Sequence, residues 1–485
     1  MINIRCKREK FAYDMYHIVK SFFPDAGISQ SIAPEQEPLV DIELEDGSCF
    51  CVWEKETEAV SGQREQKRYI NKKLYQTLSG LTGQEHAWGN MTGVRPTKMI
   101  MEKLEEGCTE EEIVRFMSDT YVVSEKKTRL GIEIAGREKR QMEMLDCENG
   151  YSIYIGIPFC PTTCSYCSFT SYPAAAWERR MDEYVEAVKK ELSFIAEVSK
   201  EKKLNTIYIG GGTPTTLSAA QMEAVLTHLE QVFSFEHLKE FTIEAGRPDS
   251  ITREKLEAMR RHLVTRISIN PQTMQQKTLD AIGRRHTVED VVEIFRMARE
   301  LGFDNINMDL IAGLPGEHPE DMEDTLRQIK RLAPDSLTVH ALAMKHGSRL
   351  TRERAASEER PDYGRMASEL EQMIDMAREA ATEMGLVPYY LYRQKNIAGN
   401  FENVGYAKVD KAGIYNILIM EERQSIVAAG AGASTKVVLP YEIDAPGSKN
   451  GRRTNLIRIE NVKDVGEYLS RIDEMIERKG EWLWR

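Results

Sequence analysis

The segment Tyr154-Ile-Gly-Ile-Pro-Phe-Cys160-Pro-Thr-Thr-Cys164-Ser-Tyr-Cys167-Ser-Phe169 places three cysteines directly after an apolar, strand-like run. Thiolates this close together repel one another unless a metal or a cluster compensates their charge. They are soft ligands that suit iron–sulfur clusters, zinc or copper(I). A structural zinc site takes four ligands, and no histidine or fourth cysteine lies nearby. Three cysteines fit a [4Fe–4S] cluster with one iron left open for chemistry. A chance group of buried cysteines is the alternative.

The composition bounds the class of protein. The chain has 485 residues, of which 41% are hydrophobic, and this is enough for two or three domains with packed cores. Its formal net charge of −12 gives no indication of a nucleic-acid partner, although a local basic pocket for an anionic substrate is compatible with it. No apolar run reaches the length of about eighteen residues that a membrane span needs.

The cysteines favour a reducing compartment. All eight lie before residue 168, which is not the distribution of a secreted disulfide framework. The N-terminal residues contain no signal-peptide apolar region. We therefore expect a cytoplasmic protein with free thiols. The cysteines are Cys6, Cys49, Cys51, Cys108, Cys147, Cys160, Cys164 and Cys167.

Outward from the cysteines, strands and helices alternate. The predicted strands are Tyr151–Ile157, Asn205–Ile209, Glu240–Glu244, Val264–Ile269, Asp304–Ile311 and Ser336–Leu342. The predicted helices between them are Trp177–Val198, Ser218–Val232, Thr252–Arg261, Gln275–Ile282, Val288–Leu301 and 318–332. This alternation predicts a parallel α/β unit, either an open sheet or a partial barrel.

Conspicuous residues fall where these strands end, and ligands of parallel α/β folds bind there. Cys160 follows the first strand and Gly210–Gly212 follow the second. Glu244 closes the third strand, Gln272 follows the fourth, and Asp309 lies late in the fifth.

The flanking regions have their own patterns. Residues 1 to about 60 indicate short strands, with a hairpin formed by Pro38–Glu45 and Ser48–Trp53. Cys49 and Cys51 would share one face of the second hairpin strand, where a place in the core is favoured over a metal role. Residues 62–82 predict a basic helix, and 109–146 predict two charged helices. The segment from Trp88 to Lys98 is either an anion-binding loop or a structural turn.

Beyond the alternating region, residues 360–384 predict a helix whose methionines fill a core. A strand is predicted at Ile414–Met420 and a final helix at 463–478. The run Ala428–Ser434 consists of small residues. We divide the chain into residues 1–148, 149–384 and 385–485.

The constellation of motifs resembles the radical S-adenosylmethionine (SAM) enzymes, and within them the oxygen-independent coproporphyrinogen III oxidase family. The order and separation of the motifs match over about residues 150–345. Leu391–Asn400 and Thr92–Lys98 are similar to the HemZ-type branch. The motifs are Cys160-x3-Cys164-x2-Cys167, Gly210-Gly-Gly-Thr-Pro214, Ile243-Glu244, Arg266-Ile-Ser-Ile-Asn-Pro-Gln272, Arg284 and Asp309-Leu-Ile-Ala-Gly-Leu-Pro315.

The resemblance implies a partial (β/α)6 radical SAM barrel with an N-terminal α+β domain and a C-terminal α+β extension that covers the substrate. It implies a [4Fe–4S] cluster on the three cysteines, with SAM chelating the open iron and a second SAM molecule also possible. Electron transfer from the cluster would break SAM into methionine and a 5′-deoxyadenosyl radical. The protein would position the cofactors and exclude competing reactions.

The resemblance also assigns residues to SAM. Glycine backbone approaches the methionine end closely, the carboxylates and Gln272 bind ribose hydroxyls, and Arg284 pairs with a carboxylate. Gly430–Ala433 would lie near a second SAM molecule. The SAM-binding residues implied are Tyr154, Tyr166, Gly211, Gly212, Thr213, Glu244, Gln272, Arg284, Asp309 and Ala343, and Tyr154 and the cysteines would be catalytic.

Two positions depart from the family pattern. Family members commonly have a histidine where this chain has Gly156, so a proton-delivery role of that histidine is absent. Some members carry a further cysteine two residues after the third cluster cysteine. This chain has Phe169 there, as in relatives that include haem-trafficking proteins. The cluster and SAM are therefore firmer expectations than the substrate.

Three functions stay open. The first is oxidative decarboxylation of two propionates of coproporphyrinogen III to vinyl groups, giving protoporphyrinogen IX. The second is a haem chaperone that keeps the cluster, and the third is a radical SAM enzyme acting on another tetrapyrrole, such as a haem-opening methyltransferase. We expect a monomer that takes electrons from a donor such as flavodoxin or ferredoxin. Candidate propionate partners are Arg393 and Lys395, or Arg95 and Lys98, and candidate haem ligands are His340 and His346.

Overall fold

The computed structural model describes residues 1–57, 60, 62–345, 347–356, 362–394, 397–446 and 453–485. They form two compact units. The first consists of Met1–Gly136, Glu358–Gln372 and Leu391–Asn403, and the second of Arg137–Ser357, Met373–Tyr390 and Val404–Arg485. The division at residues 148 and 384 stays a prediction.

Six parallel strands form the centre of the second unit, in the spatial order β5-β8-β9-β10-β11-β12. This confirms the predicted parallel α/β unit of an open sheet or partial barrel, since neighbours along the chain are neighbours in the sheet. The strands are rich in buried Ile, Val and Leu because helices cover parallel sheets. Their bounds are β5 Gly150–Ile157, β8 Lys203–Gly211, β9 Glu240–Gly246, β10 Arg266–Ile269, β11 Ile306–Ala312 and β12 Ser336–Ala341.

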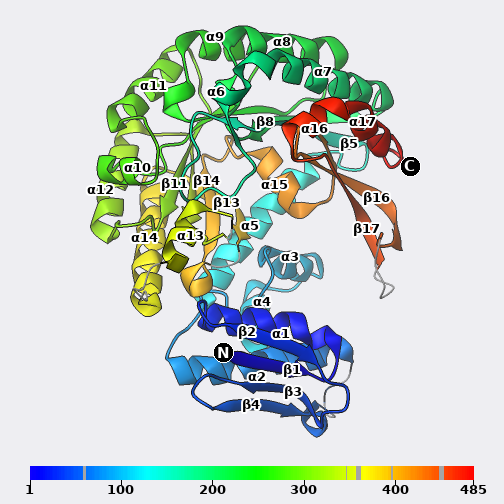
Figure 1. The fold of residues 1–485 in the computed structure, drawn as a ribbon, viewed down its shortest axis with the longest axis vertical. Helices are drawn as coiled ribbons and strands as arrows, with labels where there is room; N and C mark the ends of the chain where they lie inside the picture. The colour runs from blue at the N-terminus through cyan, green and yellow to red at the C-terminus, as the bar shows by residue number, and fades with distance from the viewer. Residues whose placement is uncertain (58–59, 61, 346, 357–361, 395–396, 447–452) are drawn as a thin grey trace. The chain divides into compact units, whose positions relative to one another are not determined.

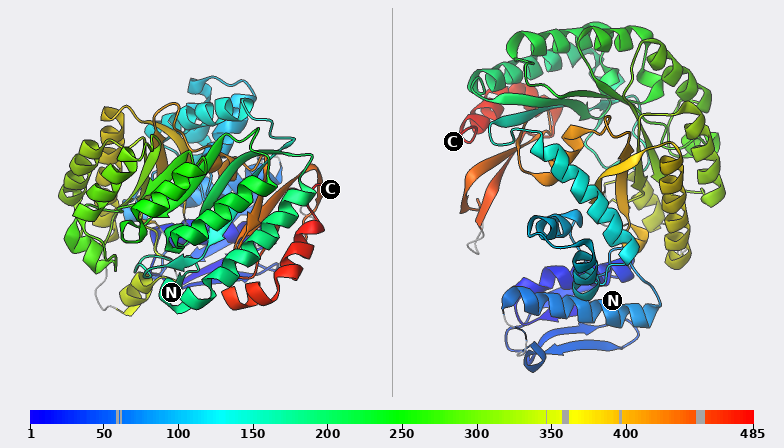
Figure 2. Two further views of the ribbon diagram at one scale, coloured as in Figure 1. Left: turned by 90° about the horizontal axis from the view of Figure 1, so that it is seen from above. Right: turned by 180° about the vertical axis from the view of Figure 1, so that it is seen from behind.

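Helices connect these strands and lie on the outer side of the curved sheet, as Figures 1 and 2 show from three directions. Each turns an apolar stripe inward. In the helix Arg253–Arg261, for example, Leu256 and Met259 are buried. Ser218 and Thr287 form capping boxes that start two of them. The helices are α7 Met181–Val198, α8 Ala219–Val232, α9 Arg253–Arg261, α10 Gln276–Ala281, α11 Val288–Glu300 and α12 Pro319–Leu332, with the short α6 Ala174–Trp177 before them.

The C-terminal elements extend the same sheet on both sides. The eleven-stranded sheet has the order β13-β14-β12-β11-β10-β9-β8-β5-β15-β16-β17. Strand β15 is parallel to β5, whereas β14 is antiparallel to β12 and β16 is antiparallel to β15. These elements are β13 Val387–Arg393, β14 Glu402–Ala407, α15 Ile414–Glu421, β15 Ser425–Ala429, β16 Ser434–Asp444, β17 Arg453–Glu460, α16 Val465–Ser470 and α17 Ile472–Gly480.

The predicted strand at Ile414–Met420 is wrong, because this segment is helix α15. Its run of apolar residues has no period that separates a buried strand from a buried helix. The first-turn amide of Ile414 donates to the carboxylate of Glu240 at the start of β9, which satisfies a helix N-terminus. A partner distant in the sequence therefore decides the local structure.

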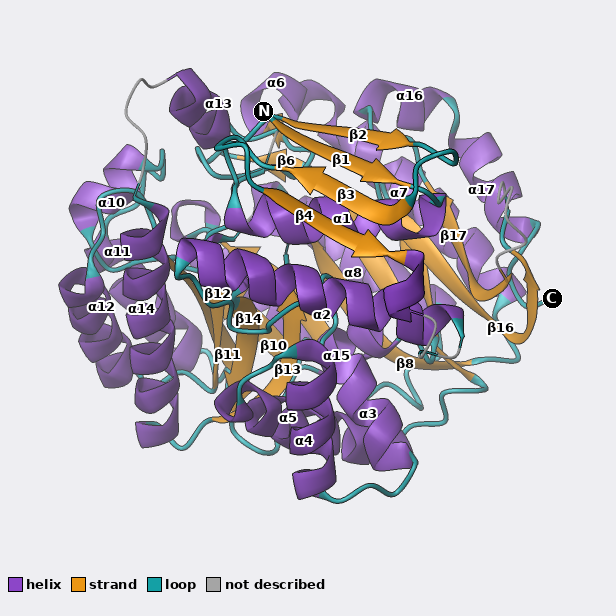
Figure 3. Ribbon diagram, turned by 90° about the horizontal axis from the view of Figure 1, so that it is seen from below, coloured by secondary structure: helices purple, strands orange, loops and turns teal. Residues whose placement is uncertain are grey.

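The first unit contains a four-stranded sheet of order β2-β1-β3-β4, visible in Figure 3, on which α1 and α2 pack. The hairpin of β3 and β4 confirms the prediction, and so does the basic helix α2. The elements of this unit are β1 Ile2–Cys6, α1 Glu9–Phe22, β2 Ile28–Ile32, β3 Pro38–Glu43, β4 Cys49–Trp53, α2 Gln63–Thr82, α3 Thr97–Glu105 and α4 Glu110–Tyr121. Helices α5 Glu125–Glu143 and α14 Tyr363–Glu383 are divided between the two units, and α13 Arg349–Ala356 belongs to the second.

Two expectations for this unit are wrong. Residues 9–22 form a helix and not part of a run of strands, because Phe11, Met15 and Phe22 face the core at helical spacing. Cys49 and Cys51 share a face, as expected, but it is the outer one, since Phe50 and Val52 fill the core.

In the part of the chain that the structure describes, no helix is long and apolar enough to cross a membrane.

Candidate active site

The cysteine loop is held against the end of β8 by backbone hydrogen bonds. The amide of Gly212 donates to the carbonyl of Ile157 at 2.8 Å, and that of Thr213 donates to the carbonyl of Phe159 at 2.7 Å. A Cβ on Gly212 would lie 2.6 Å from the Phe159 carbonyl oxygen, so only glycine permits this approach. The hydroxyl of Thr213 lies 3.5 Å from Cys160 Sγ and donates to it.

The far side of the loop contacts the segment after α10. Thr162 Oγ1 donates to the carbonyl of Gly283 at 3.0 Å, and the amide of Ser165 donates to the carbonyl of Ile282 at 2.9 Å. The amide of Cys167 donates to the carbonyl of Cys164 at 3.1 Å, which closes a turn between two of the cysteines. Two strand ends and one loop therefore fix the backbone of the whole motif.

The three thiols lie close enough to affect one another. Burial raises the pKa of Cys160, and Cys164 adds to the effect while the Thr213 hydroxyl opposes it. Burial also raises the pKa of Cys167, with further contributions from Cys164 and Cys160. Thiolates at these positions therefore need a compensating positive group.

Glu244 and Asp309 present carboxyl groups on β9 and β11. Burial raises the pKa of Glu244 to about 7, an effect that the nearby Asp309 strengthens and the Tyr208 hydroxyl, which donates to it, opposes. Burial acts to raise the pKa of Asp309 too, but His340 and Asn307 outweigh it, so this pKa lies below its usual range. Asn307 Nδ2 donates to Asp309 at 2.7 Å, and His340 Nε2 lies 3.8 Å from the same carboxylate.

Gln272 occupies a strained backbone position after β10. Its φ is +70°, which non-glycine residues rarely adopt, and such strain is typical of functional sites. Its amide donates to the carbonyl of Asp309 at 3.0 Å, and its carbonyl accepts from Ile311 at 2.9 Å. Its side-chain Oε1 is buried and has no partner among the described residues. An acceptor is thus left available beside Asp309.

Arg284 is buried with a guanidinium that donates to the carbonyl of Asn270. Its Nε has no partner among the described residues. Arg284 lies close enough to Tyr166 and Cys164 to interact with both, and it opposes the rise that burial gives the pKa of Tyr166. A buried cation with spare donor capacity beside the cysteine loop suits a carboxylate ligand.

Tyr154 belongs to an aromatic stack. Its ring centroid lies 6.2 Å from that of Tyr208 and 6.3 Å from that of Tyr415, and the planes are nearly parallel. A Cβ on Gly211, whose φ is +109°, would lie 3.4 Å from the Tyr154 hydroxyl. Ala343 is buried just after β12.

The remaining predicted residues are placed differently. Arg393 is buried in the first unit, where it donates to the carbonyl of Met91 at 2.9 Å, so it is neither solvated nor free for a propionate. Arg95 is half-buried and Lys98 is exposed. Lys395 and His346, which the sequence also suggested, lie outside the described residues.

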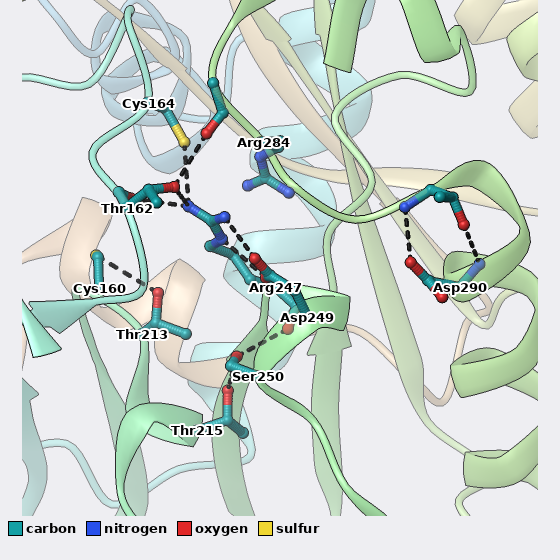
Figure 4. Close-up of polar contacts among 12 residues, drawn as sticks. Cys160, Thr162, Cys164, Thr213, Thr215, Arg247, Asp249, Ser250, Arg284 and Asp290 are labelled. Carbon is teal, nitrogen blue, oxygen red and sulfur yellow. Dashed lines mark hydrogen bonds and ion pairs between the residues drawn. The ribbon is translucent and has the colours of Figure 1, made fainter. Parts of the chain in front are cut away.

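Two residues escaped the sequence-based search. Arg247, in the loop after β9, donates to both oxygens of Thr162, each at 2.8 Å, and Figure 4 shows it between the cysteine loop and Asp249. Tyr208 donates to Glu244 from the neighbouring strand. Tyr208 stands two residues before Gly210, and the alternation of a strand places side chains two apart on one face. No comparable signal marks Arg247.

Three comparisons relate the chain to known proteins. A model of the Radical SAM superfamily matches residues 154–329. The oxygen-independent coproporphyrinogen-III oxidase-like protein HemZ of Bacillus subtilis is 40% identical over 88% of this chain and 82% of its own length. The heme chaperone HemW of Bacillus subtilis is 36% identical over 40% of this chain and 51% of its own. The solved structure of coproporphyrinogen III oxidase HemN from Escherichia coli superposes with a TM-score of 0.51, at 20% identity, over 68% of this chain and 70% of that one.

Fold and site thus define a radical SAM protein. The length and identity of the match to the HemZ relative place it more narrowly, and the chain belongs to the family of oxygen-independent coproporphyrinogen-III oxidase-like proteins. Its cofactors are a [4Fe–4S] cluster and S-adenosylmethionine.

The residues present fit these cofactors. Among the described residues no three His, Cys, Asp or Glu side chains converge as the ligands of one metal ion would. A cluster makes a different demand, because each thiolate binds its own iron. Three neighbouring thiols, the unpartnered Oε1 of Gln272 and the unpartnered Nε of Arg284 supply the donors and acceptors that a cluster and an amino-acid ligand require.

Proposed function

We propose that the protein catalyses the oxidative decarboxylation of two propionates of coproporphyrinogen III to vinyl groups, giving protoporphyrinogen IX in anaerobic haem biosynthesis. The observation that carries the proposal is the 40% identity to the HemZ protein over 88% of the chain, far beyond the radical SAM core alone. The residues at the strand ends described above are of the types that would bind the cluster and SAM, which this reaction uses.

The reaction balances as follows. Each propionate loses one hydrogen atom from its β-carbon, one molecule of CO2 and one electron, and the β- and α-carbons become a vinyl group. The reduced cluster and SAM, when bound, supply the radical that removes the hydrogen atom. The first electron comes from a donor of the flavodoxin or ferredoxin class, and the last passes to an acceptor outside the chain.

The chain's own residues would bind and orient. Cys160, Cys164 and Cys167 would hold the cluster with one iron open. Arg284 would pair with the SAM carboxylate, since it is buried and keeps a free Nε–H.

The adenosyl end of SAM would meet the carboxyl groups. Glu244, Asp309 and the unpartnered Oε1 of Gln272 would accept hydrogen bonds from the ribose hydroxyls. The backbone of Gly211–Thr213 would lie along the methionine end, and Tyr154, Tyr166 and Ala343 would line the same cavity.

A haem chaperone is the second candidate. Some family members carry a further cysteine at the position of Phe169. Phe169 is 69% exposed, and the ammonium of Lys345 lies 5.4 Å from the centroid of its ring. The HemW relative is a heme chaperone by name. His340 is a poor axial ligand in this arrangement, because its Nε2 faces Asp309.

Product analysis under anaerobic conditions separates the candidates. Reconstituted full-length protein receives coproporphyrinogen III, SAM, reduced flavodoxin and a one-electron acceptor of higher potential, and the products are measured by mass spectrometry. The proposal predicts protoporphyrinogen IX with two molecules of CO2. SAM cleavage without CO2, or stable haem binding without any porphyrinogen turnover, would count against it. In a parallel reaction with haem in place of coproporphyrinogen III, addition of a methyl group would instead indicate action on another tetrapyrrole.

A further inference from the structure

Arg247 is a buried cation fixed against the cysteine loop. Its side chain is 4% exposed, and Asp249 binds its guanidinium on one edge through Nε at 3.0 Å and Nη2 at 2.6 Å. Such a two-point pair fixes the plane of the guanidinium. Nη1 on the other edge points at the loop, as Figure 4 shows.

That edge donates to the loop at three atoms. Nη1 lies 2.8 Å from the carbonyl oxygen of Thr162, 2.8 Å from its Oγ1, and 3.9 Å from Cys164 Sγ. The sulfur contact lies within the distance expected of a weak N–H···S hydrogen bond. None of the roles given above to the SAM-binding residues requires Arg247.

A cation and a hydrogen bond at a ligand sulfur affect the two redox states of a cluster unequally. The reduced cluster carries one more negative charge, so it gains more from a nearby positive charge and from an N–H donor. Burial strengthens the effect, because little water screens the charge. Asp249 offsets part of the charge, but it binds the edge of the guanidinium that faces away from the sulfur.

We propose that Arg247, held in place by Asp249, is a positioning residue that raises the reduction potential of the cluster through its contact with Cys164. The proposal rests on the cysteines being the cluster ligands and not on the identity of the tetrapyrrole. A higher reduction potential makes the first electron transfer, from the external donor to the cluster, more favourable.

The test is a redox titration of the reconstituted full-length protein, without SAM or porphyrinogen, followed by the electron paramagnetic resonance signal of the reduced cluster. We expect Arg247→Met to make one-electron reduction about tenfold less favourable, a midpoint about 59 mV more negative. Arg253→Met is the matched control, because Arg253 is an exposed arginine on the next helix, paired with Glu300. It should leave the midpoint unchanged.

A further variant keeps the test decisive if Arg247→Met does not assemble a cluster. Arg247→Lys retains the charge but loses the planar fork, and its midpoint should lie between those of the wild type and Arg247→Met. Assembled clusters with wild-type midpoints in these variants would overturn the proposal, because a purely structural Arg247 would change cluster content and leave the potential alone.

Discussion

At the residue scale, neighbouring groups give the two buried carboxyls of Glu244 and Asp309 different pKa values. Both are removed from water, which favours their neutral forms. Asp309 has the Asn307 amide at 2.7 Å and the His340 ring nearby, and these hold its pKa down. Among the residues that the structure describes, Glu244 has only the Tyr208 hydroxyl as a direct partner, and its pKa rises to about 7. One site thus contains a permanent anion and a carboxyl that titrates near neutrality.

SAM binding should therefore depend on pH through Glu244. The group is mostly neutral below about pH 7 and mostly charged above it, and the charged form is the stronger hydrogen-bond acceptor. We expect the affinity for SAM to fall as pH drops below 7, by at most about tenfold per unit. Isothermal titration calorimetry between pH 6 and 8 measures the SAM affinity of the reconstituted protein.

Glu244→Gln should bind SAM more weakly at pH 8 and lose this component of the pH dependence. The exposed Glu236→Gln is the matched control and should behave like the wild type. Parallel pH profiles for wild type and Glu244→Gln would remove Glu244 from the SAM site.

At this scale the sequence predicts types of residue better than their partners. The three cysteines, Glu244, Asp309 and Arg284 were selected because their spacing matches a family. The structure adds what pairs with them, such as Tyr208 with Glu244 and His340 with Asp309. Arg247 was missed because its role depends on a contact with Cys164 across 83 residues of chain.

The junction of β5 and β8 is the element on which the cysteine loop depends. Gly212 lies where the backbone of one strand end crosses the other, with the Phe159 amide nitrogen 2.9 Å and the Ile157 carbonyl oxygen 3.0 Å from the position of a Cβ. These neighbours are backbone atoms, so they cannot yield as a flexible side chain would. The strand ends must separate if a side chain is added.

We expect Gly212→Ala to displace the segment that carries Cys160 and to reduce cluster content. Overpacking of this kind costs about 1–3 kcal/mol. Iron and acid-labile sulfide per protein, measured after anaerobic reconstitution, report the loss. Gly93→Ala is the control, because nothing lies within 4 Å of its Cβ position. A Gly212→Ala protein with full cluster content would show that this close approach is unnecessary.

The sequence predicts elements well where they alternate and poorly where they do not. All six central strands and their crossover helices were found, because buried parallel strands and amphipathic helices differ in length and period. Helix α15 was missed because a uniformly apolar segment lacks such a period. Strands β16 and β17 were missed because their pairing, and not their composition, defines them.

The whole molecule combines segments that are distant in the sequence. In the first unit, Glu402 is fully buried and accepts from Trp88 Nε1 at 2.9 Å and from the ammonium of Lys127. The amide of Arg393 donates to the carbonyl of Val94 at 2.8 Å. Residues from near 400 thus complete a unit that begins at Met1, which no division of the sequence into consecutive domains anticipates.

At the same scale, the proposed activity requires three cysteines of one loop to hold the cluster that cleaves SAM. The most direct test measures 5′-deoxyadenosine formed anaerobically from SAM and dithionite by wild type, Cys164→Ala and Cys147→Ala. Cys147 is the matched control, because it lies just before β5 in the same unit and outside the motif. We predict formation by the wild type and Cys147→Ala and none by Cys164→Ala. Undiminished 5′-deoxyadenosine from Cys164→Ala would contradict the account.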